Sequence, residues 1–212
     1  MKTSIYLIIK RGLDIIASIC ALILLSPLFL LIAIAIKLES KGPIFYKGER
    51  LGLNKQRILI YKFRTMCADA ETRLNELLNT DKKALDVWQT YQKLTHDPRI
   101  TKVGNFLRKT SLDELPQFFC ILKGDLSLVG PRTYIETIVQ QDEFAKYRGQ
   151  FDNIFSVKPG LTCLWQISGR NELTHQDRIF LDSLYSKQKS FSKDLAILFK
   201  TIPVVLQKQG AR

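Results

Sequence analysis

The chain has 212 residues, 46% of them hydrophobic, which is enough for one packed domain plus a membrane element and argues against global disorder. Its formal net charge of +12 favours anionic partners such as nucleic acid, anionic lipid or phosphorylated substrates, and an apolar segment near the start favours the last two. The four cysteines form no C-x-x-C pair and the two histidines have no partner at ligand spacing, so we expect reduced thiols and neither a disulfide framework nor a zinc site.

An uncharged apolar run from Ile15 to Ile36 dominates the first part of the chain. As a straight helix it would measure about 33 Å, enough to span a bilayer core of about 30 Å. However, Pro27 lacks an amide hydrogen and crowds the preceding turn, the Ser26 hydroxyl favours a bend, and each arm alone is too short to cross. Both flanks are basic, which places both on the cytoplasmic side. A kinked single-pass helix and a re-entrant hairpin broken at Ser26-Pro27 both stay open.

A strand and a long helix are predicted next. Gln56 to Met66 is rich in β-branched and aromatic residues, and its period of two places Lys62 and Arg64 on one face, where the two cations either hold a diphosphate or are solvated. The residues from Cys67 to Leu94 have helical apolar spacing. The expected buried stripe of this helix consists of Leu74, Leu77, Leu78, Leu85 and Trp88.

Segment 110–117 contains two adjacent carboxylates, Asp113 and Glu114. Because Pro116 is tolerated only in the first turn of a helix, we expect a helix to begin close to Asp113. One interpretation is a cap, with Asp113 as N-cap or Ser111 and Glu114 as a capping box. The other is chemistry, since a helix N-terminus attracts phosphate, and one carboxylate can face a phosphorus atom while the other holds Mg²⁺.

Two turns further along the chain present arginines. Gly124 to Arg132 is predicted as a short strand ending in a turn, and Lys158 to Arg170 repeats that pattern. Arginine suits bidentate phosphate contacts, although exposed arginines after turns are common. From Phe180 to Gln209 the apolar spacing is helical with lysines opposite, so this helix either lies in the headgroup layer or covers a core.

Taken together, these motifs resemble those of the bacterial sugar transferases, the monotopic polyprenyl-phosphate phosphoglycosyl transferases. The resemblance runs from about Lys10 to Gly210. The matching runs are Lys10-Arg11-x-x-Asp14, Ser26-Pro27, Lys62-Phe63-Arg64-Thr65-Met66, Asp97-Pro98-Arg99, Ser111-Leu112-Asp113-Glu114-Leu115-Pro116-Gln117, Gly124-Asp125-x-Ser127-Leu128-Val129-Gly130-Pro131-Arg132, Pro159-Gly160-Leu161-Thr162 and Gly169-Arg170.

The resemblance implies an α/β, α+β-like fold with a small cytoplasmic catalytic domain in residues 41–212. Residues 1–40 would be a re-entrant membrane anchor broken at Ser26-Pro27, and amphipathic interfacial helices would lie beside it. The location would be the cytoplasmic face of the bacterial inner membrane. The partners would be a UDP-sugar, polyprenyl (undecaprenyl) phosphate and membrane lipid, without nucleic acid. A homodimer is compatible with the resemblance, and the chain would be a minimal form or a fragment of a larger membrane protein.

In members of this family the aspartate of an Asp-Glu pair attacks the β-phosphate of a nucleotide sugar. UMP leaves, and polyprenyl phosphate then takes the sugar phosphate from the aspartyl intermediate. Carried over to this chain, Asp113 is the nucleophile and Glu114 helps hold Mg²⁺. The candidates for phosphate and nucleotide contacts are Lys62, Arg64, Arg108, Arg132 and Arg170.

Some residues depart from the family's pattern or bear on the choice of sugar. Thr133 follows Gly-Pro-Arg where proline is usual, and Cys163 stands where glycine is usual. The stretch 87–94 resembles members that transfer hexose 1-phosphate, such as galactose or glucose, and an N-acetylamino sugar phosphate is the alternative. A rival from another class is a non-catalytic, membrane-anchored basic module that binds anionic lipid or nucleic acid.

Overall fold

The computed structural model describes residues 2–91, 94, 97–169 and 173–207. Over these residues the fold is a helix-rich α/β arrangement with an antiparallel sheet, β1–β2, and a parallel sheet, β3–β4. The strands are β1 (Phe45–Leu51), β2 (Arg57–Phe63), β3 (Ser127–Val129) and β4 (Gly160–Thr162). The helices are α1 (Lys2–Leu24), α2 (Ser26–Glu39), α3 (Ala70–Thr80), α4 (Lys82–Tyr91), α5 (Lys102–Thr110), α6 (Gln117–Lys123), α7 (Glu136–Val139), α8 (Arg148–Phe155), α9 (His175–Gln188) and α10 (Phe191–Leu206), with 3-10 turns η1 (Leu53–Lys55), η2 (Leu112–Glu114), η3 (Asp142–Tyr147) and η4 (Trp165–Ile167).

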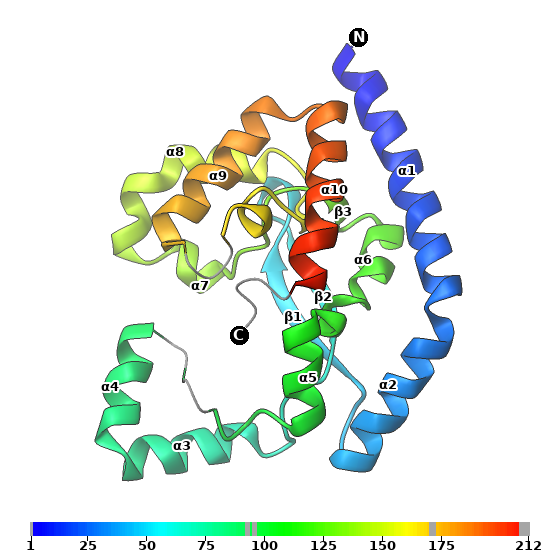
Figure 1. Ribbon diagram of the computed structural model, residues 1–212. Helices are drawn as coiled ribbons and strands as arrows, with labels where there is room; N and C mark the ends of the chain where they lie inside the picture. The colour runs from blue at the N-terminus through cyan, green and yellow to red at the C-terminus, as the bar shows by residue number, and fades with distance from the viewer. Residues whose placement is uncertain (1, 92–93, 95–96, 170–172, 208–212) are drawn as a thin grey trace.

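Helices α1 and α2 form a bent pair along one side of the molecule (Figure 1). Their axes differ by 60°, Pro27 lies in the first turn of α2, and the Ser26 hydroxyl donates to the carbonyl oxygen of Ile23 at 2.8 Å. The predicted break at Ser26-Pro27 is therefore confirmed. In the described part of the chain no helix taken singly has the length and apolarity to cross a membrane, whereas the bent pair meets both criteria when its two helices are counted together.

Polar side chains tie α1 to the rest of the molecule. The guanidinium of Arg11 donates to two carbonyls at the end of α6, and the Asp14 carboxylate accepts from the amide of Leu128 at 2.9 Å. Lys10 pairs with Asp194 of α10 at 2.6 Å. The opposite side of the bent pair is apolar and exposed, at Ile8, Ile16, Ile23, Leu24, Leu30 and Leu31. The polar contacts thus turn an apolar face outward.

Besides a small cluster of Val129, Tyr185 and Ile197, three hydrophobic clusters hold the body together. Ile32 and Ile36 of α2 pack with Phe63 and Leu107, so the second half of the bent pair is part of the core. A second cluster joins β2 to α6 and the chain before β3, through Ile58, Ile60, Cys120, Ile121 and Leu126. The third lies under α8 and α9 and contains Leu51, Tyr134, Phe144, Phe151, Ile154, Phe155 and Ile179.

The predicted single helix from Cys67 to Leu94 is two helices, α3 and α4. The chain breaks at Asp81, whose carboxylate accepts from the amides of Lys83 and Ala84 and so starts α4. The five residues of the predicted stripe are half-buried rather than buried. The physical reason is visible in Figure 1, where α3 and α4 project from the body and no second layer covers them.

The predicted C-terminal helical region is likewise divided, into α9 and α10. Ser190 caps α10 by accepting from the amide of Lys193. Helix α10 turns Asp194 and Ile197 inward, while Leu195, Phe199 and Ile202 of the predicted apolar face are 43%, 64% and 56% exposed. Leu198 of the same predicted face is half-buried and packs against Val129, Tyr185 and Ile197, so α10 covers core on one side and leaves the rest of that face exposed.

Candidate active site

The adjacent carboxylates lie in a tight turn between α5 and α6. Helix α5 ends at Ser111, whose φ of 59° is left-handed, and η2 follows at once. A short 3-10 helix thus begins close to Asp113 as expected, whereas the α-helix α6 begins only at Gln117, with Pro116 at its N-cap. Neither η2 nor α6 has a side-chain cap, and both capping interpretations are therefore wrong. Instead Asp113 is buried, with its side chain 12% exposed.

Lys62 of β2 reaches across to both carboxylates. Its ammonium nitrogen lies 2.6 Å from Oε1 of Glu114 and 3.7 Å from Oδ2 of Asp113. Burial raises the pKa of Asp113, the positive charge of Lys62 opposes that rise, and the neighbouring Glu114 charge adds to it. The site thus holds a desolvated carboxylate that one lysine helps to keep ionised.

Of the candidate residues Arg108 and Arg64, only Arg108 lies close to the two carboxylates. Arg108 is largely buried, donates from Nε to the Thr65 hydroxyl at 2.9 Å and favours the ionised form of Asp113 by its charge. Arg64 does not reach the site. Its guanidinium donates to the carbonyls of Lys41 and Ser40 at 2.6 and 2.7 Å, one residue after β2 ends at Phe63.

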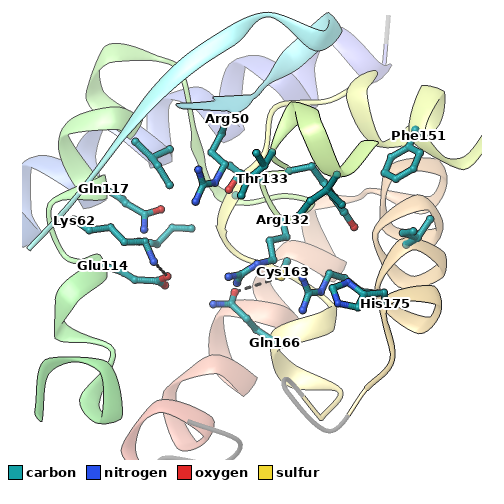
Figure 2. A pocket seen from close by; sticks show the side chains of 18 of the residues that line it. Arg50, Lys62, Glu114, Gln117, Arg132, Thr133, Phe151, Cys163, Gln166 and His175 are labelled. Atoms are coloured by element: carbon teal, nitrogen blue, oxygen red, sulfur yellow. Dashed lines mark hydrogen bonds and ion pairs between the residues drawn. The ribbon is translucent and has the colours of Figure 1, made fainter. Parts of the chain in front are cut away.

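A cavity of about 150 Å³, here called the central cavity, adjoins Lys62 and Glu114. Figure 2 shows Lys62, Glu114 and Gln117 at one end, Arg50 and Arg132 in the middle, and Phe151 and His175 at the other end. Its lining includes Arg50, Ile60, Lys62, Glu114, Gln117, Arg132, Thr133, Tyr134, Ile135, Ile138, Phe144, Phe151, Gly160, Leu161, Cys163, Gln166, His175, Arg178 and Ile179. Cations thus gather on a wall next to the carboxylates.

The cavity contains predicted residues and residues that the sequence patterns do not mark. Of the candidates from the sequence, Lys62, Glu114 and Arg132 line the cavity, Asp113 does not, and Arg170 lies outside the described residues. Arg50 and Arg178 belong to no motif. One sequence feature could have drawn attention to Arg178. It lies four residues before Asp182, a spacing that places both side chains on one side of a helix.

The two departures from the family pattern also lie at the cavity. Thr133 is in its lining. Cys163 is buried, its thiol lies 3.4 Å from Oε1 of Gln166, and burial raises its pKa to about 12. A thiol in that state is an inert packing group rather than a nucleophile.

The chemistry of the paired carboxylates fits a magnesium ion. Mg²⁺ is usually bound through one or two carboxylates together with substrate phosphates, rather than by a cage made wholly of protein. Asp113 and Glu114 supply such a pair beside a cationic cavity. Over the residues that the structure describes there is no cluster of three or more His, Cys, Asp or Glu side chains arranged for a metal.

Two adjacent carboxylates and a cationic cavity thus lie in the same molecule as an exposed apolar helix pair. The model of the bacterial sugar transferase family matches residues 5–208. The chain therefore belongs to the bacterial sugar transferase family.

Curated relatives are similar over nearly the whole chain. An undecaprenyl-phosphate galactose phosphotransferase of Salmonella typhimurium is 45% identical over 96% of this chain and 41% of its own length. A UDP-galactose-lipid carrier transferase of Erwinia amylovora is 42% identical over 96% of this chain and 41% of its own. The exopolysaccharide production protein ExoY of Sinorhizobium fredii is 44% identical over 95% and 87%. The chain thus spans about two fifths of some relatives and most of another.

Proposed function

We propose that this chain transfers a sugar 1-phosphate from a UDP-sugar to polyprenyl (undecaprenyl) phosphate, releasing UMP. The observation that carries the proposal is the buried Asp113, which lies 3.7 Å from the Lys62 ammonium and next to Glu114 in sequence; Lys62 and Glu114 both line a cationic cavity. The similarity to two relatives named for galactose and undecaprenyl phosphate or lipid-carrier transfer supports the substrate class.

The reaction proceeds in two steps that balance. An Asp113 carboxylate oxygen attacks the β-phosphorus, the bond from that phosphorus to the bridging oxygen breaks, and its electron pair leaves with UMP. A phosphate oxygen of the polyprenyl phosphate then attacks the same phosphorus and returns the carboxylate. Splitting the transfer in this way means that the soluble and the lipid substrate need not be bound together.

Electrostatics decide whether an anionic carboxylate can approach a diphosphate. Lys62, Arg50 and Arg132 line the cavity and lower the repulsion, while Arg108 stabilises the ionised Asp113 from behind. Glu114, with Asp113, would hold Mg²⁺, which supplies further neutralisation of the phosphates when bound.

The apolar surface suggests how the chain meets the membrane. The exposed outer face of the bent pair and the exposed face of α10 bear large apolar side chains. We place residues 1–40 as a re-entrant anchor at the cytoplasmic face of the bacterial inner membrane, with residues 41–212 as the catalytic part and α10 in the headgroup layer. In a cysteine-free background, Thr3→Cys should resist labelling by an impermeant thiol reagent added outside intact cells, and labelling there would exclude the hairpin.

The reaction is tested by incubating purified protein with polyprenyl phosphate, Mg²⁺ and a panel of UDP-sugars, and by measuring UMP release. We expect turnover with UDP-galactose or UDP-glucose, whereas exclusive use of an N-acetylamino sugar would favour the alternative donor. Asp113→Asn should abolish lipid-linked product and leave membrane association intact. The matched control is Asp152→Asn, at an exposed carboxylate paired with Lys55, which should keep full turnover. Substantial turnover by Asp113→Asn would remove the aspartyl step.

A further inference from the structure

Two arginines that line the central cavity come from distant segments and lie over the same buried indole ring. The guanidinium carbon of Arg178 lies 4.2 Å from the centre of the Trp165 ring, and that of Arg132 lies 4.9 Å from it. Trp165 is 3% exposed, and both arginines line the cavity. Stacking on an aromatic face fixes the plane of each guanidinium and leaves its N–H groups free to point sideways. Arg132 and Arg178 are called the arginine pair below.

In the described residues no carboxylate forms an ion pair with the arginine pair, although the buried Asp182 interacts electrostatically with both arginines. Among the same residues, Nε of Arg178 is buried with no hydrogen-bond acceptor. Burial lowers the pKa of Arg178, and the positive charge of Arg132 lowers it further. Two partly buried like charges repel each other, so the arrangement is stabilised when an anion with several oxygen acceptors bridges them.

A buried carboxyl group supports the pair from behind. Asp182 lies one helical turn after Arg178 and has no exposed surface. Its Oδ2 accepts from the Tyr134 hydroxyl at 2.8 Å, and the carbonyl of Tyr134 accepts from the amide of Leu51 in β1. This chain of contacts fixes the loop that carries Arg132 against α9. The pair is therefore held in position before any substrate arrives.

We propose that the arginine pair binds the α-phosphate of the nucleotide, the group that departs with UMP, and that Arg178 is a substrate-binding residue of this chain. The proposal rests on the proposed transfer reaction. Lys62 and Glu114 stand at the end of the cavity where the attacked phosphorus must lie, and Arg132 stands further along the lining (Figure 2). Arg178 also lines the cavity. When the bond to the bridging oxygen breaks, the α-phosphate gains a second negative charge, so the pair binds the transition state more tightly than the substrate.

The direct test compares UMP with uridine, which lacks the phosphate. Calorimetric titration of the full chain in detergent should give at least about tenfold tighter binding of UMP than of uridine, since phosphate contacts to arginine are charge-assisted and bidentate. Arg178→Gln should reduce that preference about tenfold, and Arg178→Lys, which keeps the charge but loses the fork, should reduce it less. The control Arg57→Gln removes an exposed arginine paired with Glu136 and should leave the preference unchanged.

The outcomes separate this proposal from the transfer reaction itself. If wild-type protein binds uridine as tightly as UMP, or if a folded Arg178→Gln keeps the full preference, the arginine pair is not the phosphate site even where UMP release is intact. If UMP is preferred but no UDP-sugar yields UMP, the transfer reaction fails and the phosphate site stands. In active protein, Arg178→Gln should lower kcat for UMP release more than it raises KM, and a change confined to KM would contradict the transition-state role.

Discussion

Arg64 has two possible roles, substrate binding, as the family motif implies, or stabilisation of the fold, as its contacts indicate. Its resemblance to the family motif made it a phosphate candidate, yet its guanidinium makes three hydrogen bonds to the chain that follows α2, to the carbonyls of Ser40 and Lys41 and to the Ser40 hydroxyl. Gly42, whose φ is +121°, leaves room for this approach, because a Cβ there would meet the guanidinium. We therefore predict that Arg64 stabilises the fold and does not bind substrate.

The magnitude follows from the groups that Arg64→Met would leave without a donor. Two carbonyls would each cost about 1–3 kcal/mol if fully desolvated. Lys41 is exposed and Ser40 is half-buried, so water reaches part of this loop, and the lower half of the range, about 2–4 kcal/mol in total, applies. For a chain of this size, 1 kcal/mol shifts the melting temperature by about 2–4 °C, so Arg64→Met should melt about 5–15 °C lower.

The assay is thermal unfolding of purified protein at one scan rate, paired with the KM for the UDP-sugar measured well below the melting temperature. Arg64→Met should keep KM within about twofold of wild type, because the guanidinium lies outside the central cavity. Arg57→Met removes an exposed arginine at the start of β2; it is the matched control and should change neither quantity. An unchanged melting temperature together with a tenfold higher KM would refute the structural role of Arg64.

Two further predictions concern ionisation. Lys62→Met should raise the pKa of Asp113, because the lysine charge opposes the effect of burial, and the acidic limb of the kcat/KM profile should move to higher pH; an acidic limb that stays in place would show that another group controls it. Burial raises the pKa of Asp182 to about 7, above the value near 4 expected in the unfolded chain. The folded protein therefore binds the proton more tightly than the unfolded chain does. The free energy of unfolding of the wild type should fall by up to about 1.4 kcal/mol per pH unit between pH 4 and 7, relative to Asp182→Asn. Denaturant unfolding across that range measures the difference, and parallel curves for the two proteins would contradict it.

Exposed residues supply the controls for both experiments. Lys123→Met removes an exposed lysine that pairs with Asp125, and the pH profile should keep its acidic limb. Asp152→Asn removes an exposed carboxylate and should leave the slope of stability against pH unchanged. Each control changes a charge of the same kind without changing a buried site.

Local sequence was sufficient where the determining interaction is short-range. The bend at Ser26-Pro27 follows from a missing amide and a hydroxyl that bonds one turn back, and both lie within four residues. The prediction of one long helix over 67–94 was wrong although its cause is also local. The carboxylate of Asp81 caps a new helix, and the periodicity of apolar residues does not reveal such a break. The α3–α4 projection also shows that helical spacing of apolar residues does not guarantee a covering layer.

The amino-acid sequence alone determined the broken apolar segment, the adjacent Asp113 and Glu114, and the family to which the chain belongs. Only the tertiary structure decided which cationic side chains contact those carboxylates. Lys62 meets Glu114 across 52 positions of sequence, while Arg64, two residues later, binds the backbone carbonyls of Ser40 and Lys41 instead. Arg178 joins Arg132 through a shared indole that no motif marks. The direction of a side chain depends on packing between distant segments, and a local pattern contains no information about that packing.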